Sequence, residues 1–161
     1  MAIEQTLVLI KPDGFKRGLT GLVIDRLDQA GLELIGAKMV GVSEKLAKEH
    51  YQDLADKPFF PNLIRYIRGE FHDLKANQVL ALVYQGEGAI ALTRKVAGAT
   101  NPEQADPHSI RGSFGRVTTQ GQFENVLHAS GNAGDALREV ALWFKAEELV
   151  SAVRATANGK H

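Results

Sequence analysis

Apolar and polar residues alternate along the first part of the chain in short stretches that stop at turn residues. Residues 3–10 alternate, are rich in Leu, Val and Ile, and end at a Pro-Asp-Gly turn, which predicts a strand. Apolar residues then recur at helical spacing over 19–30, and Gly31 follows in the usual cap position. We expect a helix there and a second strand over residues 32–42.

The middle of the chain is expected to carry shorter elements. Ser43 is a good N-cap for a helix that runs to Leu54, and a short helix is expected over residues 63–67. Residues 79–84 predict a third strand, and residues 86–96 have the composition and period of a second long helix.

A long irregular connection precedes the last elements. Residues 97–122 are rich in Gly, Pro, Thr, Asn and Asp and show little periodicity, which is typical of a connection that carries function. Residues 124–130 then predict a short last strand, and a helix is expected from Asp135 through Trp143. The chain after Trp143 is expected to be polar and frayed.

With the short helices set aside, the predicted order is βαββαβ. This order packs two long helices on one face of a four-stranded antiparallel sheet, which is a ferredoxin-like α+β sandwich. A length of 161 residues suits a single core, so we expect residues 1–161 to form one domain. The fold hosts many unrelated activities, so the function must be argued from individual residues.

The composition excludes several classes of protein. Nineteen basic residues balance nineteen acidic ones, so no overall field draws the chain to nucleic acid or to an anionic membrane. The absence of cysteine excludes disulfides, thiolate zinc sites and cysteine nucleophiles. No apolar run approaches the roughly 18 residues that span a bilayer, and the first residues lack a signal-peptide pattern. We therefore expect a cytoplasmic protein without a membrane segment or a nucleic-acid site.

Any phosphate must be bound by side chains, because the chain lacks the G-K-[ST] of a P-loop. Residues 86–91 match G-x-G-x-x-A, but they follow the third predicted strand and place Glu87 where a pyrophosphate would lie, so an ordinary turn is favoured. Arg94 and Arg111 carry the forked donors that suit phosphate, and Lys11 ends the first strand. Each also fits a solvated surface cation.

Of the five histidines, His128 has the environment that favours chemistry. It shares a predicted strand face with Val126 and Ser130, and Glu139 is available from the following helix. An imidazole oriented by a carboxylate has one nitrogen fixed as a donor and the other free as a nucleophile, as covalent phosphoryl transfer requires. A hydrogen-bonded core histidine is the alternative interpretation.

Three aromatic residues flank the turn before the short helix: Tyr51, Phe59 and Phe60. A ring presented there could stack on a nucleobase, and stacking tolerates any base because every base has a π-face. Core packing is the commoner use of such residues, so no single feature decides the function.

Five blocks, taken together and in order, resemble the signature of nucleoside diphosphate kinases, and the likeness spans nearly the whole chain. The order makes the resemblance far more specific than any one block, and the last block is similar to the family's active-site pattern. The blocks are Lys11-Pro12-Asp13-Gly14, Lys57-Pro58-Phe59-Phe60, Gly98-Ala99-Thr100-Asn101-Pro102, Ile110-Arg111-Gly112 and Asn125-Val126-Leu127-His128-Ala129-Ser130.

The resemblance implies an enzyme that moves the γ-phosphoryl group of a nucleoside triphosphate, typically ATP, to a nucleoside diphosphate. His128 would be phosphorylated on Nδ1, with Glu139 and Ser130 orienting it, and Tyr51 matches the family's tyrosine near the histidine. The reaction would be ping-pong, with broad base tolerance. The family also implies a homo-oligomer, either a hexamer or a tetramer.

The resemblance also implies how the nucleotide is bound. The phosphate ligands would be Lys11, Arg94, Thr100 and Arg111. Lys11 and Asn125 would also meet the ribose, while Phe59 and Leu63 match positions that clamp the base. Mg²⁺ would arrive chelated by the nucleotide, since no carboxylate cage is evident in the sequence. Positioning and charge neutralisation by these groups suit phosphoryl transfer.

Three departures from the family pattern stand out. Gly131 replaces the aspartate that usually follows the serine of the last block, and the chain is longer than compact members around residues 69–77 and 116–122. None removes a catalytic group. The second residue of the base clamp stays unassigned, because the alignment through the inserted region is ambiguous.

Two other functions deserve comparison. A hydrolase would use His128 with Ser130, but residues two apart on a strand point the same way, and no G-x-S-x-G elbow is present. A nucleotide-binding or assembly module without turnover is the other, and Gly131 would be its first symptom. Phosphorylation by ATP distinguishes both from a kinase.

Overall fold

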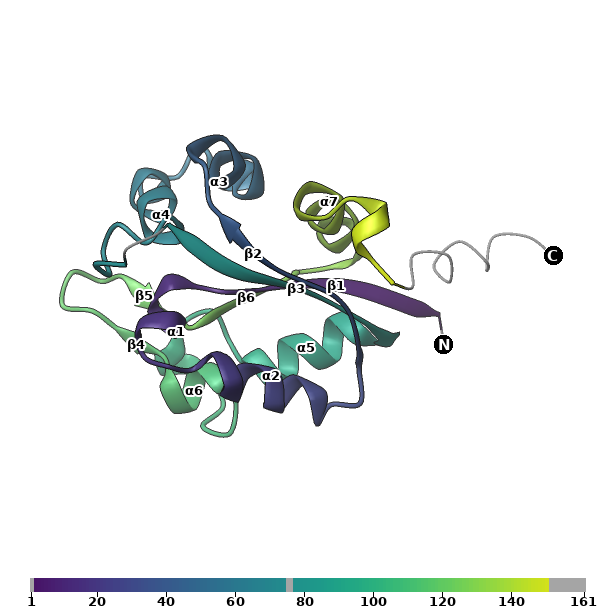
Figure 1. The fold of residues 1–161 in the computed structure, drawn as a ribbon. Helices are drawn as coiled ribbons and strands as arrows, with labels where there is room; N and C mark the ends of the chain where they lie inside the picture. The colour runs from purple at the N-terminus through teal and green to yellow at the C-terminus, as the bar shows by residue number, and fades with distance from the viewer. Residues whose placement is uncertain (1, 75–76, 151–161) are drawn as a thin grey trace.

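A computed structural model of the protein describes residues 2–74 and 77–150. Its centre is a four-stranded antiparallel sheet in the order β2-β3-β1-β6, as Figure 1 shows. The strands are β1 (Ile3–Ile10), β2 (Glu33–Gly41), β3 (Gln78–Glu87) and β6 (Leu127–Ala129). This is the predicted ferredoxin-like arrangement, so the predicted fold is confirmed.

Helices cover both faces of the sheet, in two layers that Figure 1 separates. The helices of one layer are α2 (Thr20–Asp28), α5 (Ala89–Ala97) and α6 (Ile110–Phe114). The helices of the other are α3 (Glu44–His50), α4 (Phe60–Ile67) and α7 (Ala133–Trp143). The two long helices expected on one face are α2 and α5, while the opposite face is covered by α3, α4 and α7, the last of which is longer than either at 11 residues.

Strand β1 lies at the centre of the sheet and is buried on both sides. Leu7 and Leu9 pack into the layer of α3, α4 and α7, while Val8 and Ile10 pack into the layer of α2 and α5. All four side chains have no exposed area. Burial on both faces explains why this strand is almost entirely apolar, and it gives a rigid support to the residue that follows, Lys11.

The turn predicted after β1 is the first turn of a short helix, α1 (Pro12–Lys16). Pro12 lies at the first helical position, where its fixed φ suits a helix and its missing N–H costs nothing. Lys11 is the N-cap residue and is only 6% exposed. The predicted turn is thus the start of a short helix, with Lys11 buried at the end of the sheet.

The segment predicted as the second long helix begins later than expected. Residues 86 and 87 continue β3, and α5 starts at Ala89 after Gly88, whose φ of 62° lies in the left-handed region. The amide of Ile90 donates to the Glu4 carboxylate at 3.2 Å. Because the helix start already carries a carboxylate of the chain, the glycine pattern forms an ordinary strand-to-helix turn.

The expected irregular connection over residues 97–122 contains regular structure. It includes the 3₁₀ helix η2 (Pro102–Gln104), α6, and β4 (Arg116–Val117), which pairs with β5 (Phe123–Glu124) in a hairpin. The side chains of Asn101 and Ser109 accept hydrogen bonds from the amides of Glu103 and Gly112 and so cap the two helices. The sequence predicted a long connection with little periodicity. Elements of two to five residues are too short to produce a period, and the capping residues mark them instead.

The predicted strand over residues 124–130 is divided in two. Glu124 belongs to the hairpin, and β6 begins only at Leu127, because Val126 has a φ of 71°. That conformation is unfavourable for a β-branched residue, so it must be held by its surroundings.

The end of the described chain is more ordered than the sequence predicts. Helix α7 begins at Ala133, because the Asn132 side chain caps it by accepting from the Asp135 amide at 2.9 Å. Phe144 is buried, and the Val150 amide donates to the carbonyl of Ile35 at 3.0 Å. The 3₁₀ helix η3 (Ala146–Glu148) lies between Phe144 and Val150. A further 3₁₀ helix, η1 (Gln52–Leu54), follows α3. The rest of the expected polar tail, 151–161, is outside the described residues.

None of the helices in residues 2–74 and 77–150 is both long and apolar enough to cross a bilayer.

Candidate active site

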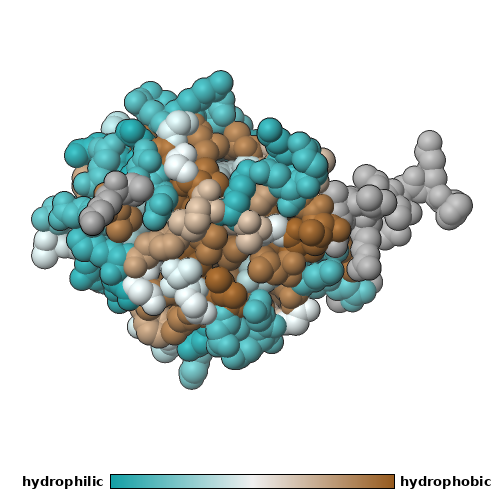
Figure 2. Space-filling view, viewed as in Figure 1, coloured by the Kyte–Doolittle hydropathy of each residue, from teal (hydrophilic) through white to brown (hydrophobic). Residues whose placement is uncertain are grey.

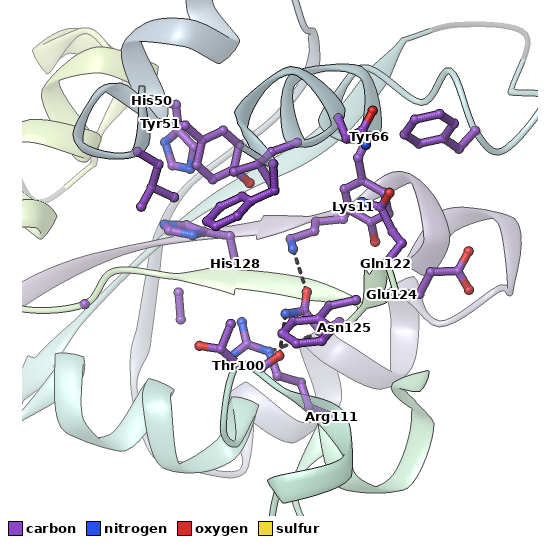
Figure 3. Close-up of a pocket in the computed structure, with 18 of the residues that line it drawn as sticks. Lys11, His50, Tyr51, Tyr66, Thr100, Arg111, Gln122, Glu124, Asn125 and His128 are labelled. Atoms are coloured by element: carbon purple, nitrogen blue, oxygen red, sulfur yellow. Dashed lines mark hydrogen bonds between the residues drawn. The ribbon is translucent and has the colours of Figure 1, made fainter. Parts of the chain in front are cut away.

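A cleft of about 1170 Å³ opens beside the sheet where β1 ends, as Figure 3 shows. It brings together ten of the eleven residues predicted for the site. These are Lys11, Tyr51, Phe59, Leu63, Arg94, Thr100, Arg111, Asn125, His128 and Glu139. The eleventh, Ser130, is fully buried behind Glu139 and does not line the cleft.

His128 is the imidazole at the centre of the cleft. It lies in β6 opposite Leu9, and its Nε2 is 2.7 Å from Oε2 of Glu139 on α7. The same carboxylate oxygen accepts the Ser130 hydroxyl at 2.9 Å, and that hydroxyl accepts the amide of Leu7 at 3.1 Å. A carboxylate can only accept, so Nε2 carries the proton and Nδ1 keeps its lone pair. The contact network therefore makes Nδ1 the nucleophilic nitrogen.

Burial and the surrounding charges keep this imidazole neutral. Burial lowers the pKa of His128 well below its ordinary value, and the positive charges of Lys11, Arg111 and Arg94 lower it further. Burial raises the pKa of the Glu139 carboxyl, although the Ser130 hydrogen bond and neighbouring positive charge oppose that shift. At neutral pH the ring is unprotonated, which is the form that can attack phosphorus.

Lys11 and Asn125 form a fixed polar pair near His128. The Lys11 ammonium donates to Oδ1 of Asn125 at 2.5 Å and lies 5.2 Å from the centre of the Tyr66 ring. The Asn125 amide donates to the carbonyl of Thr100 at 2.8 Å. Burial lowers the pKa of Lys11 to about 8, which the Asp13 carboxylate partly opposes. The cation is thus positioned before any ligand binds.

The two arginines play different parts in the described structure. Arg111 is buried and donates to three carbonyls, those of Gly98, Asn125 and Leu127, at 2.8, 3.3 and 2.7 Å. Burial lowers the pKa of Arg111 to about 10, and the nearby charge of Arg94 contributes. Arg94 is exposed and makes no side-chain hydrogen bond or ion pair with the described residues. Arg111 therefore anchors the site while it lines the cleft, and Arg94 is free to bind an anion.

An unfavourable backbone conformation beside the site is held by α1. The Val126 amide donates to the Asp13 carboxylate at 2.9 Å, and its carbonyl accepts the Lys11 amide at 2.9 Å. The other Asp13 oxygen accepts the hydroxyl of Tyr66. These contacts fix the start of β6, and with it the position of His128 two residues later. Asp13 and Tyr66 were not predicted to belong to the site.

His50 is a second histidine in the site, and it was not predicted to belong there. It is 3% exposed, and its ring meets the His128 ring edge to face, with centroids 4.5 Å apart. Nδ1 of His50 accepts the indole N–H of Trp143 at 3.1 Å, while its Nε2 is buried without a partner among the described residues. The adjacent Tyr51 is the sequence signal that could have drawn attention to it.

Gly131 has a local explanation in the structure. A Cβ at this position would lie 2.8 Å from a carboxylate oxygen of Asp135 in the first turn of α7. The Asn132 side chain holds that carboxylate with a 2.8 Å hydrogen bond. The start of α7 is therefore stabilised by its own cap, and glycine leaves room for it.

The carboxylates around the cleft do not form a cage for Mg²⁺. Of the four carboxylates that line the cleft in the described residues, Glu124, Asp135 and Glu139 are engaged by protein donors, and Asp53 is exposed. His50, His128 and Glu139 bring their ligand atoms within 4.8 Å of one another, but Mg²⁺ prefers oxygen over imidazole. The residues present fit a metal ion that is carried by the phosphates of a ligand.

The fold and the cleft define a class of protein, a ferredoxin-like α+β protein with a neutral imidazole set among cations suited to phosphate. The family model described as "Nucleoside diphosphate kinase" matches residues 4–149. The chain belongs to the nucleoside diphosphate kinase family.

Individual relatives agree with that membership. The chain is 44% identical to the nucleoside diphosphate kinase of Synechococcus sp. (strain JA-3-3Ab), over 96% of each chain. It is 36% identical to the Borrelia burgdorferi nucleoside-diphosphate kinase, whose structure is a transition-state mimic with bound vanadate and ADP. The TM-score is 0.83 over 94% of this chain and 92% of that one. The chain is 39% identical to the Halobacterium salinarum enzyme in complex with CDP, with a TM-score of 0.81 over 92% and 91%.

Proposed function

We propose that this protein is a nucleoside diphosphate kinase, which transfers the γ-phosphoryl group of a nucleoside triphosphate, typically ATP, to a nucleoside diphosphate. The observation that carries the proposal is the His128 imidazole, neutral, fixed at Nε2 by Glu139 and placed in the cleft beside cations. Family membership supports it.

The transfer proceeds in two balanced steps. The Nδ1 lone pair of His128 attacks the γ-phosphorus in line, the bond to the β-phosphate oxygen breaks, and the nucleoside diphosphate leaves with that electron pair. A terminal oxygen of the second diphosphate then attacks the phosphorus, and the N–P bond breaks to restore the neutral ring. Glu139 stabilises the positive charge of the phosphorylated ring through the Nε2–H.

The remaining predicted residues bind the nucleotide in this proposal. The phosphate ligands are Lys11, Arg94, Thr100 and Arg111, all of which line the cleft. Lys11 and Asn125 meet the ribose hydroxyls, the Tyr51 hydroxyl lies near the reacting phosphate, and Phe59 and Leu63 contact the base. Mg²⁺ enters on the nucleotide phosphates, where it neutralises part of their charge.

The proposal extends to assembly and location. Strand β2 is an edge strand, with Met39 51% and Leu34 39% exposed. Figure 2 shows hydrophobic residues gathered across the middle of the displayed face. An unpaired edge with apolar side chains favours pairing between copies, which supports the homo-oligomer, a hexamer or a tetramer, that the family resemblance implies. We further propose that residues 1–161 act as one domain in the cytoplasm.

Incubation with radiolabelled ATP tests the enzymatic proposal. The chain should form an acid-labile phosphoryl adduct that a nucleoside diphosphate discharges, and His128→Ala should form none. His108→Ala is the matched control, because its side chain is 97% exposed and lies outside the cleft. ATP binding without any adduct would favour a module that has lost turnover, and labelling of Ser130 by a fluorophosphonate would favour a hydrolase.

A further inference from the structure

All three phenylalanine rings that are exposed within the described residues line the same cleft. Phe59, Phe71 and Phe123 are 52%, 42% and 38% exposed. Single exposed apolar residues are common on protein surfaces, but several gathered on one concave surface indicate a binding site. Flat aromatic rings suit a ligand that has a π-face of its own.

Two of these rings come from the regions where the chain is longer than compact members of the family. Phe71 follows α4, and Phe123 begins β5 directly after the longer turn over residues 116–122. The resemblance to the family assigns Phe59 to the base but gives no role to the other two. The structure nevertheless places both of them in the cleft.

A buried contact joins the two regions. Nε2 of His72 lies 2.9 Å from Oε1 of Glu124, and the two residues are 5% and 7% exposed. The other Glu124 oxygen accepts from Arg116. Burial by itself raises the pKa of Glu124, but the hydrogen bonds from Arg116 and His72 outweigh it and leave that pKa below its ordinary value. The His72–Glu124 contact therefore holds the two regions together as one wall of the cleft.

This wall also presents a polar group to the cleft. Gln122 lines the cavity and is labelled among its residues in Figure 3. The Gln122 amide nitrogen of the backbone donates to Oγ1 of Thr118 at 3.0 Å, which fixes the hairpin turn. The side-chain amide makes no hydrogen bond with the described residues and offers both donors and an acceptor. A nucleobase edge carries the complementary groups.

The cleft has room for contacts beyond a single stacking ring. Its volume of about 1170 Å³ exceeds the roughly 300–1000 Å³ that is usual for sites of small ligands. A purine presents two fused rings and a pyrimidine only one. A purine therefore presents more ring surface and more edge groups to a second wall than a pyrimidine does.

We infer that Phe71, Phe123 and Gln122 form a second base-binding wall that gives this enzyme a preference for purine over pyrimidine nucleotides. The inference rests on the proposed function and adds a substrate class to it. The two rings contact the face of the base, and the Gln122 amide contacts its edge.

Discharge of the preformed phosphoenzyme by ADP, GDP, CDP and UDP tests this inference. The second-order rate constant of the unaltered protein should be higher for the purine diphosphates. Phe123→Ala should lower that constant about fivefold to tenfold for ADP and GDP and less than twofold for CDP and UDP. Phe71→Ala and Gln122→Ala should also reduce the difference between the rate constants for purine and pyrimidine diphosphates. Leu137→Ala, which is 78% exposed on α7, should leave it unchanged.

The outcomes separate the inference from the function on which it rests. Rate constants that fall equally for both classes of base in the variants, or that do not change, would contradict the inferred second wall without contradicting the proposed kinase activity. A protein that takes no phosphoryl group from ATP would overturn the kinase itself. The amount of phosphoenzyme formed at saturating ATP reports folding, and the half-buried Gln122 gives a variant that does not depend on removing a large ring.

Discussion

At the scale of single residues, His128 depends on one carboxylate for its tautomer and on burial and three nearby cations for its neutrality. Glu139 accepts from both Nε2 of His128 and the Ser130 hydroxyl, so the ring cannot rotate without losing a buried hydrogen bond. Lys11 and Arg111 are held before any ligand arrives. The site is therefore preorganised, which is how electrostatic catalysis avoids reorganisation during the reaction.

Glu139→Gln tests the carboxylate. Glutamine keeps the size of the side chain but removes the charge that stabilises the phosphorylated imidazole, so the rate of phosphorylation by ATP should fall by about tenfold to a hundredfold. Rapid-quench measurement of the adduct gives this rate. Glu147→Gln, on η3 outside the cleft, is the control. An unchanged rate would remove Glu139 from the mechanism.

The Lys11 ammonium predicts a pH dependence on the alkaline side. Burial lowers its pKa to about 8 in the free protein, so the charge is complete below that pH and is lost as the pH rises through it. The value of kcat/KM for ATP should therefore decline above about pH 8. Lys11→Gln should be slower throughout and lack this decline. A decline that persists in the variant would assign it to another group.

At the scale of elements, the joint between α3 and α7 supports the nucleophile. Trp143 on α7 donates to His50 on α3, and the His50 ring packs against His128. Arg138 on α7 donates to the carbonyls of Glu49 and His50 at 3.0 and 3.2 Å. These contacts pack α3 and α7, which are far apart in the sequence, against the imidazole of His128.

His50→Phe should weaken the contact between α3 and α7 without leaving a cavity. The ring volume is retained, but the indole N–H of Trp143 loses its acceptor, which should lower the free energy of unfolding by about 1–3 kcal/mol. Urea unfolding measures this change, and the rate of adduct formation should fall as well. His108→Phe is the surface control. A stability equal to that of the unaltered protein would contradict the role of His50 in the joint.

Helix α1 supports the strained start of β6 in a similar way. Asp13→Ala removes the acceptor of both the Val126 amide and the Tyr66 hydroxyl, so we expect a loss of about 2–4 kcal/mol in the free energy of unfolding. Asp25→Ala, on the exposed side of α2, should change it by less than about 0.5 kcal/mol. Equal stabilities for the two variants in urea unfolding would show that Asp13 does not hold Val126.

The elements also show what local sequence patterns could and could not predict. Strand β1 could be predicted from its apolar run and α2 from its helical spacing, because both patterns involve residues that are close in sequence. The β4–β5 hairpin depends on the contact of His72 with Glu124, 52 positions away, and the position of His50 depends on Trp143, 93 positions away. No local pattern contains such contacts, so these parts of the site were missed.

At the scale of the whole molecule, the sheet separates structural and chemical tasks. Its two apolar faces carry the core, while the end of β1 and the start of β6 meet at the cleft. The opposite edge, β2, is distant in the strand order from β6 and offers exposed apolar residues for assembly. Substrate and partner copies can therefore use different edges of one sheet.

A charge on the β2 edge tests the assembly. Met39→Glu should reduce the mass in solution from that of an oligomer toward that of one chain, because a carboxylate on a paired edge is costly to bury. Light scattering after gel filtration measures the mass. Leu137→Glu, exposed on α7, is the control. An oligomer that survives Met39→Glu would place the interface elsewhere.

The central claim is that His128 accepts the phosphoryl group on Nδ1 because Glu139 holds Nε2. Nuclear magnetic resonance of the ATP-phosphorylated protein, with ¹⁵N in its histidines, tests this directly through coupling between phosphorus and nitrogen. We predict one coupled nitrogen, Nδ1 of His128, and none in His128→Ala. Phosphorus on Nε2, on another residue, or on no residue would contradict the mechanism.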